Sequence, residues 1–204
     1  MALHLVGRAI EVSQALKGMF VFDDLITPEG RGKGIRQERE LFDYFEQCMI
    51  ITTFSFQALE AYCNQTVADD MKAPVQLERR RDGKKQLITL NSPADVERTA
   101  STEEKLATVV PAVLEMASPR GKAVWGPFVA LKRARDATIH LKSLDQYPNR
   151  KELGFEDDSS LFYQFLYQDM AQYPKAAVAL IHYFTRRTVV PRWLMPQLEL
   201  YGIT

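Results

Sequence analysis

The sequence lacks a long hydrophobic run, has few cysteines and carries no excess of charge of either sign. No run of about 18 apolar residues occurs, so we expect no membrane-spanning helix and no membrane partner. The 26 Lys and Arg residues balance 26 Asp and Glu residues, which excludes a protein that is basic over its whole surface. His4, Arg8 and Glu11 interrupt the N-terminal segment, which therefore does not resemble a signal peptide. We expect a cytoplasmic protein.

Cysteine and histidine are too few and too scattered to indicate a zinc site. Cys48 and Cys63 lie on one expected helix and are about 22 Å apart along its axis, which is too far for a disulfide. Free thiols are typical of a reducing compartment. The three histidines, His4, His140 and His182, form no zinc-binding spacing with the cysteines or with each other. We therefore expect no metal and no cofactor.

The apolar residues recur mostly at helical spacing. With 204 residues, of which 46% are apolar and 25% charged, the chain is long enough to bury a core and has the composition of an ordinary globular protein. The expected helices span about residues 3–20, 37–71, 101–116, 127–143, 159–172 and 175–188. The sequence therefore predicts a mostly α fold, a bundle of about six helices with one short β-hairpin, forming a single domain over residues 1–204.

The segment 37–71 gives the strongest helical pattern and is apolar on two sides. One stripe contains Leu41, Phe45, Cys48, Met49, Thr52, Phe56, Leu59, Cys63 and Val67, and a second strip contains Ile50, Ile51, Phe54, Ala58 and Ala61. A helix that is apolar on two sides is buried on two sides. We expect it to be the central helix of the bundle or to pack its second face against another chain.

A period of two replaces the helical period over about residues 75–90. An Asp82-Gly83 turn between two such runs predicts a β-hairpin. The hairpin is strongly basic and contains Arg79, Arg80, Arg81, Lys84 and Lys85. Such a patch either binds the backbone of RNA or is a solvated turn, and both interpretations stay open.

Residues 28–34 form a second loop-like segment, rich in glycine, with Lys33 among the glycines. It resembles a phosphate-binding loop only in composition, because the order G-x-x-x-x-G-K-[ST] is absent and no strand is expected before it. We expect a plain flexible turn. The capping-box pattern Ser101-Thr-Glu-Glu104 predicts the start of the next helix, and Pro111 is expected to kink that helix.

The expected helix 127–143 carries an arginine in an unusual position. An apolar arc on this helix contains Phe128, Leu131, Thr138 and Ile139. Arg135 falls inside that arc when the residues are placed 100° apart around the axis. An arginine on a core-facing stripe is costly unless it is paired or lines a polar pocket. Four positions separate Asp136 from His140, so the carboxylate is close enough to orient the imidazole.

The string Arg135-Asp136-Ala137-Thr138-Ile139-His140 resembles the R-x(4–6)-H signature of the HEPN superfamily, in which a polar residue commonly follows the arginine. The mostly helical layout over about residues 38–188 is also similar to that superfamily. The resemblance implies a metal-independent endoribonuclease that acts as a homodimer, in which two such helices meet and pool their Arg and His side chains. It further implies a toxin or defence effector, with a cognate antitoxin as partner.

In this interpretation His140 exchanges a proton with the RNA, Arg135 stabilises negative charge on the phosphate, and Asp136 holds the His140 tautomer. Glu60 and Asn64 are candidates for support from the earlier helix, although Glu60 also lies where it can simply reach solvent. Arg133 also satisfies the R-x(4–6)-H pattern, with six residues between it and His140, so the register of the motif is open.

Two other functions remain open. Many HEPN-like domains are degenerate, so the chain is alternatively a non-catalytic helical module that binds a nucleotide, RNA or a protein partner. It is also compatible with an unrelated helical structural protein.

Overall fold

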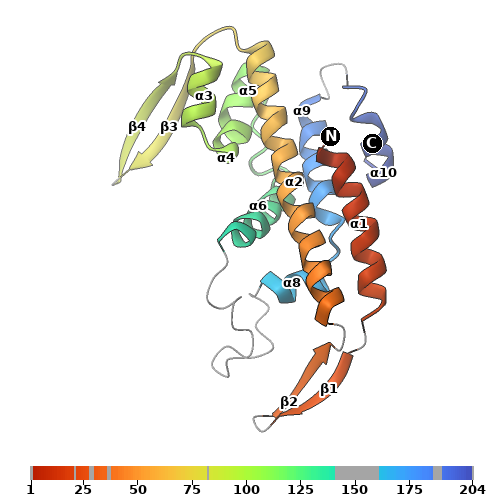
Figure 1. Ribbon diagram of the computed structural model, residues 1–204. Coiled ribbons are helices and arrows are strands. Elements are labelled where there is room, and N and C mark those ends of the chain that lie inside the picture. The colour runs from red at the N-terminus through yellow and green to blue at the C-terminus, as the bar shows by residue number, and fades with distance from the viewer. Residues whose placement is uncertain are drawn as a thin grey trace. The chain divides into compact units, whose positions relative to one another are not determined.

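The computed structural model describes residues 2–20, 22–27, 30–35, 38–81, 83–140, 161–185 and 190–203. The chain is mostly helical, so the predicted fold class is confirmed (Figure 1). No helix in these ranges is both long enough and apolar enough to cross a membrane. The helix predicted over 127–143 is described to Ile139, and residues 141–143 at its predicted end lie outside the described residues.

The chain divides into two compact units, and each is built from two stretches of sequence. The first unit contains Met1–Phe56 and Val129–Pro174, and the second contains Gln57–Phe128 and Lys175–Thr204. Three helices continue from one unit into the other, so the division does not fall at a linker. The single domain predicted over 1–204 stays a prediction.

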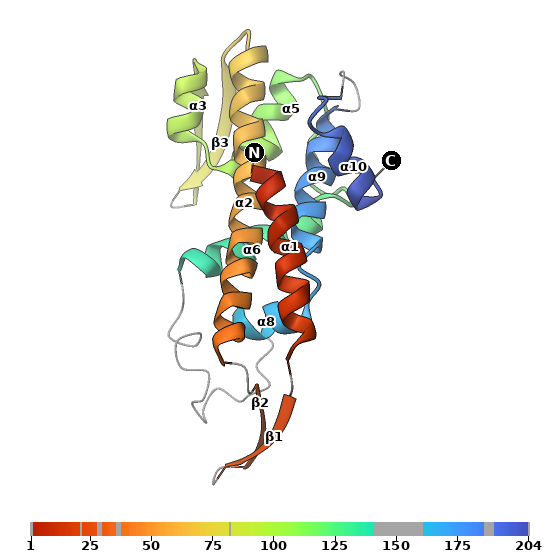
Figure 2. The same ribbon diagram turned by 45° about the vertical axis from the view of Figure 1, so that its right-hand side comes forward.

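The first unit is built on two helices that run side by side. Helix α1 (Ala2–Gly18) lies along the first part of α2 (Glu38–Asp70) in both views (Figures 1 and 2). The second part of α6 (Trp125–Ile139) and the short helix α8 (Leu161–Tyr167) also belong to this unit. The core of this unit is apolar and includes Val6, Tyr44, Cys48, Ile51, Phe56, Leu131, Leu161 and Phe165, each at most 2% exposed.

A β-hairpin follows α1 where the sequence predicts a flexible turn. Strand β1 (Phe22–Thr27) pairs antiparallel with β2 (Gly30–Ile35), in the register Phe22↔Ile35 to Thr27↔Gly30. The prediction for residues 28–34 was therefore wrong over β2. Glycine occupies every second position of the β2 sequence, and glycine has a low preference for β structure, so the sequence lacks the usual pattern of a strand.

The second unit contains the predicted hairpin. Strands β3 (Val75–Arg81) and β4 (Lys84–Leu90) pair antiparallel, with Arg81 opposite Lys84 next to the turn. Gly83 has a φ of 74°, a left-handed conformation that glycine adopts without strain and that the Asp-Gly pattern anticipates. The hairpin predicted at about 75–90 is confirmed.

The helix predicted over 101–116 is divided into short pieces, which are α4 (Thr102–Glu104), a π-helical turn over Lys105–Val109, and α5 (Val110–Val113). A separate short helix, α3 (Pro93–Thr99), precedes them. The predicted capping box is present, because the Glu104 amide donates to Ser101 Oγ at 3.3 Å and the Ser101 amide donates to Glu104 Oε2 at 2.8 Å. Most of helix α9 (Gln172–Thr185) and all of helix α10 (Met195–Tyr201) also belong to this unit.

Candidate active site on helix α6

The part of α6 that belongs to the first unit buries a stripe of small and apolar residues. Leu131 is fully buried and Ala134 is 3% exposed. Thr138 Oγ1 donates to the Ala134 carbonyl at 2.8 Å and lies 3.4 Å from Thr52 Oγ1 on α2. Ile139, which the sequence places on the buried arc, is 53% exposed. The buried face is thus rotated away from Ile139.

Arg135 lies at the edge of this buried face and is held in place by two contacts. Its guanidinium carbon is 4.1 Å from the centre of the Phe56 ring, and Phe56 is 2% exposed. Its Nη1 donates to Asp136 Oδ1 at 2.8 Å, and 27% of the Arg135 side chain is exposed. A cation over an aromatic face and a charge-assisted hydrogen bond both stabilise a fixed guanidinium position. Arg135 is therefore paired, as its position requires, and still reaches solvent.

Asp136 is engaged by cations of its own helix. Besides Arg135, it lies 3.6 Å from Lys132 Nζ. The predicted role of Asp136 in holding the His140 tautomer is not tested by these contacts and stays a prediction. His140 follows α6 directly, its backbone amide donates to the Asp136 carbonyl at 2.9 Å, and its side chain is exposed.

Arg135 and His140 point in different directions around the helix axis. Five positions correspond to about 140° around an α-helix, so one copy of α6 does not direct both side chains to one point. Arg133, the alternative motif arginine, is exposed. A composite site that draws the arginine and the histidine from two copies of α6 stays a prediction.

The two candidate supporting residues of α2, Glu60 and Asn64, belong to the second unit, and their support of the Arg135–His140 site stays a prediction. Glu60 is partly buried. The Asn64 side-chain oxygen accepts a hydrogen bond from Lys105 Nζ at 2.8 Å, and Lys105 is only 2% exposed. Sequence reasoning missed Lys105, which begins the π-helical turn. π-Helical turns are frequent at functional sites. The signal in the sequence that could have drawn attention to Lys105 is a lysine directly before the apolar residue Leu106.

Both cysteines are buried thiols. Burial raises the pKa of Cys48 and that of Cys63 to about 12, and the nearby Lys105 charge offsets only part of the effect at Cys63. A thiol is a nucleophile only as its thiolate. Neither cysteine is therefore a nucleophile at neutral pH.

Arg79 of the basic hairpin is bound to the rest of the second unit. Its Nε donates to Glu104 Oε1 at 2.6 Å, and its Nη2 donates to Glu104 Oε2 at 2.7 Å and to the Thr99 carbonyl. The Arg79 guanidinium lowers the pKa of Glu104 to about 2. This two-pronged ion pair attaches strand β3 to the capping box of α4. An RNA-binding role for Arg79 stays a prediction, but its side chain already has partners within the fold.

The other described cations of the hairpin remain at the surface. Arg80, Lys84 and Lys85 are exposed, and Lys85 lies 3.0 Å from Glu78 in a solvated pair. Arg80 and Lys85 are directly opposite each other across the two strands. Like charges facing across a hairpin are unfavourable unless an anion lies near them. The side chain of Arg81 lies outside the described residues.

No group of three or more His, Cys, Asp and Glu side chains is placed to hold a metal ion in the ranges that the structure describes. No family model, curated protein or solved structure matches the chain.

The Arg79–Glu104 pair predicts a specific loss of stability in acid. The folded-state pKa of Glu104 is about 2, below its ordinary value of 4.5, so its stabilising effect is present above about pH 4.5 and is lost as the pH falls toward 2. Urea unfolding at pH 6 and pH 3 should show that Glu104→Gln loses about 1 kcal/mol less stability than the original protein over this range, a modest figure because solvent screens the pair.

Two arginine variants provide the control. Arg79→Ser should be destabilised by about 1–2 kcal/mol at pH 6 and should show the same weakened acid response as Glu104→Gln. Arg80→Ser, one residue away and exposed, should stay within about 0.5 kcal/mol of the original protein. Equal acid sensitivity in the original protein and in the Glu104→Gln, Arg79→Ser and Arg80→Ser variants would contradict the Arg79–Glu104 ion pair.

Proposed function

We propose that this protein is a metal-independent endoribonuclease that acts as a homodimer, with a composite site formed by Arg135 of one copy and His140 of the other. The observation that carries the proposal is the guanidinium of Arg135, which the Phe56 ring and Asp136 hold at the protein surface. A cation fixed before substrate arrives stabilises charge that develops on a phosphate without reorganisation during the reaction.

The proposed RNA cleavage uses two types of side chain, an imidazole and a guanidinium. Imidazole is suited to proton transfer near neutral pH, so His140 takes the proton of the RNA 2′-hydroxyl or gives a proton to the leaving oxygen. The 2′-oxygen attacks the neighbouring phosphorus, and the bond from phosphorus to the leaving 5′-oxygen breaks. Arg135 donates hydrogen bonds to the phosphate oxygens that gain charge.

The divergence of the two side chains on α6 supports the part of the proposal that uses a second copy of the chain. Ile139 lies between Arg135 and His140 in sequence, and its exposed side chain provides apolar surface for a second helix to cover. A two-fold axis beside this helix end would bring the arginine of each copy toward the histidine of the other.

The basic hairpin supplies backbone contacts to RNA in this proposal. Arg80, Lys84 and Lys85 carry this part of it, because they are exposed and two of them face each other across the strands. The buried free thiols support a reducing compartment such as the cytoplasm. A toxin or defence role with a cognate antitoxin rests on the HEPN resemblance alone.

A non-catalytic HEPN-like module that binds a nucleotide, RNA or a protein partner is the second candidate function. The contacts of Asp136 favour it, because Arg135 and Lys132 both approach this carboxylate. A carboxylate occupied by two cations is less able to orient an imidazole. Arg135 would then serve as an anchor for an anion and not as part of a catalytic pair.

The cleavage prediction separates these two functions. Incubation of an RNA mixture with the protein in EDTA should give cleavage, and Arg135→Ala and His140→Ala should each reduce its rate by about 100-fold or more. Arg192→Ala, which removes an exposed arginine outside the candidate site, should cleave normally. Arg133→Ala tests the register of the motif, because a loss in this variant alone would move the catalytic arginine from Arg135 to Arg133.

Stability measurements distinguish lost chemistry from unfolding. His140→Ala should change the free energy of unfolding by no more than about 0.5 kcal/mol, because the side chain is exposed. Arg135→Ala should cost about 1 kcal/mol through loss of the Phe56 contact. Undiminished cleavage in both variants would refute the proposed site, and an original protein that binds RNA without cleaving it would favour the binding module.

The salt dependence of RNA binding tests the hairpin. Replacing Arg80, Lys84 and Lys85 together by serine should weaken binding and reduce the slope of log K against log salt by about 2, as three phosphate contacts to single-stranded RNA require. The matched control replaces three exposed cations elsewhere, Arg98, Lys122 and Lys175. Equal slopes in the two triple variants would identify the hairpin cations as a solvated turn.

A further inference from the structure

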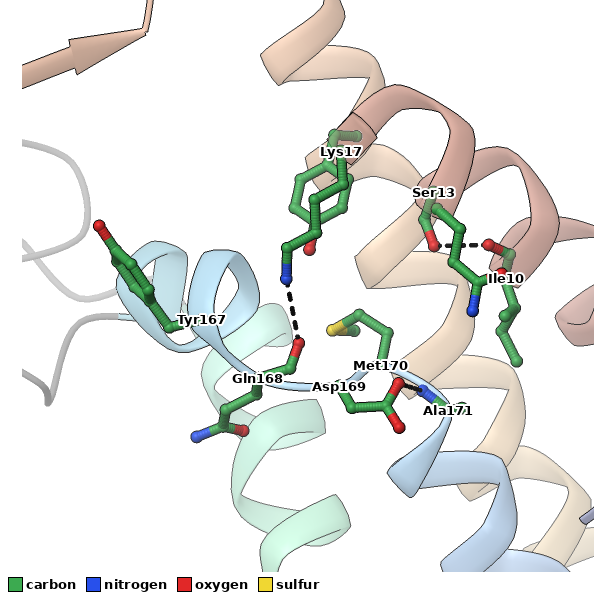
Figure 3. A pocket seen from close by; sticks show the side chains of 10 residues that line it. Ile10, Ser13, Lys17, Tyr167, Gln168, Asp169, Met170 and Ala171 are labelled. Carbon is green, nitrogen blue, oxygen red and sulfur yellow. Dashed lines mark hydrogen bonds between the residues drawn. The ribbon is translucent and has the colours of Figure 1, made fainter. Parts of the chain in front are cut away.

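A pocket of about 330 Å³ lies in the first unit, where α1, α2 and the segment after α8 meet (Figure 3). All of its lining residues belong to this one unit. Its volume is at the lower end of the range for small-molecule sites. The pocket shares no lining residue with the candidate site on α6, so a ligand bound in it is independent of the proposed ribonuclease activity.

Two opposite charges border the pocket without forming an ion pair. Lys17 extends from α1, and its Nζ lies 3.5 Å from the Gln168 carbonyl oxygen (Figure 3). Asp169 is the next residue, and its Oδ1 accepts a hydrogen bond from the Ala171 amide at 3.0 Å. No ion pair joins Lys17 to Asp169 in the described part of the chain. Lys17 Nζ thus reaches the carbonyl group of the peptide that directly precedes Asp169, so both charges border the same pocket.

Apolar groups also line the pocket. Ile10 lines the pocket from α1, and Met170, which is 5% exposed, lines it from the segment after α8. The ring of Tyr44 contributes from α2 and is 1% exposed, and its hydroxyl donates to the Phe165 carbonyl. Ser13, also in the wall, donates its hydroxyl proton to the Ile10 carbonyl at 2.8 Å. The hydroxyl protons of Ser13 and Tyr44 are therefore used within the protein, and the charged groups that line the pocket are Lys17 and Asp169.

A ligand that complements this lining carries a negative group, a positive group and an apolar group. A polyanion such as a nucleotide would face Asp169 with like charge, and a simple amine would face Lys17. We propose that the pocket binds a free α-amino acid with an apolar side chain. The ligand carboxylate binds Lys17, the ligand ammonium binds Asp169, and the ligand side chain packs against Ile10 and Met170.

Leucine and two analogues that each lack one charge test the proposal. Saturation-transfer NMR and calorimetry on the full chain should detect L-leucine binding with a Kd in the millimolar range or tighter, as two exposed charge contacts allow. The analogue 4-methylpentanoate lacks the ammonium group, and 3-methylbutylamine lacks the carboxylate. Each should bind at least about tenfold more weakly than leucine, because one pocket charge is left without a partner. An analogue that binds as well as leucine would overturn the proposal.

Variants assign the binding to this pocket. Lys17→Gln and Asp169→Asn should each weaken leucine binding by about tenfold or more, and Lys17→Arg should retain it because the charge is kept. Lys72→Gln and Asp70→Asn make the same changes at exposed positions outside the pocket and should bind leucine normally. Thermal unfolding of each variant shows that it is folded. Absence of leucine binding in the original protein, or binding that is unchanged in both Lys17→Gln and Asp169→Asn, would overturn the assignment.

Discussion

The burial of α2 along one continuous stripe is the constraint on which the other features depend. This helix has 33 residues, and its side chains at Cys48, Ile51, Leu59, Cys63 and Val67 are fully buried. The pocket, the candidate site and the buried lysine each use a residue beside that stripe. Tyr44 forms part of the pocket wall, Phe56 supports the Arg135 guanidinium, and Asn64 accepts a hydrogen bond from Lys105. The buried stripe of this helix thus also determines where charged groups find partners.

Local patterns in the sequence were sufficient for the elements whose signals are strong. The Asp-Gly turn predicted the β3–β4 hairpin, and the capping box predicted where α4 begins. The β1–β2 hairpin was missed because alternate glycines in β2 remove the side-chain pattern by which strands are recognised. The π-helical turn over Lys105–Val109 was missed because the apolar period of the sequence does not distinguish a π-helical turn from an α-helical one.

The candidate site was only partly predictable for the same physical reason. The sequence required that Arg135 have a partner but did not identify it, and the structure shows Asp136 and Phe56 in contact with Arg135. Successive residues on a helix point about 100° apart, so a contact between neighbours depends on side-chain rotamers that periodicity does not describe. The basic hairpin is a second example. The sequence pattern of a run of cations is the same whether the side chains are solvated or, as with Arg79, bound to a carboxylate distant in sequence.

The central claim is that two copies of the chain share Arg135 and His140 in one site, and a mixture of two inactive variants tests it most directly. Equal amounts of Arg135→Ala and His140→Ala, allowed to exchange subunits, should form heterodimers as half of all dimers, each with one intact site of two. We predict RNA cleavage at about a quarter of the rate of the original protein, well above either variant alone. No recovery of cleavage, in a mixture where native mass spectrometry shows the heterodimer, would contradict the composite site.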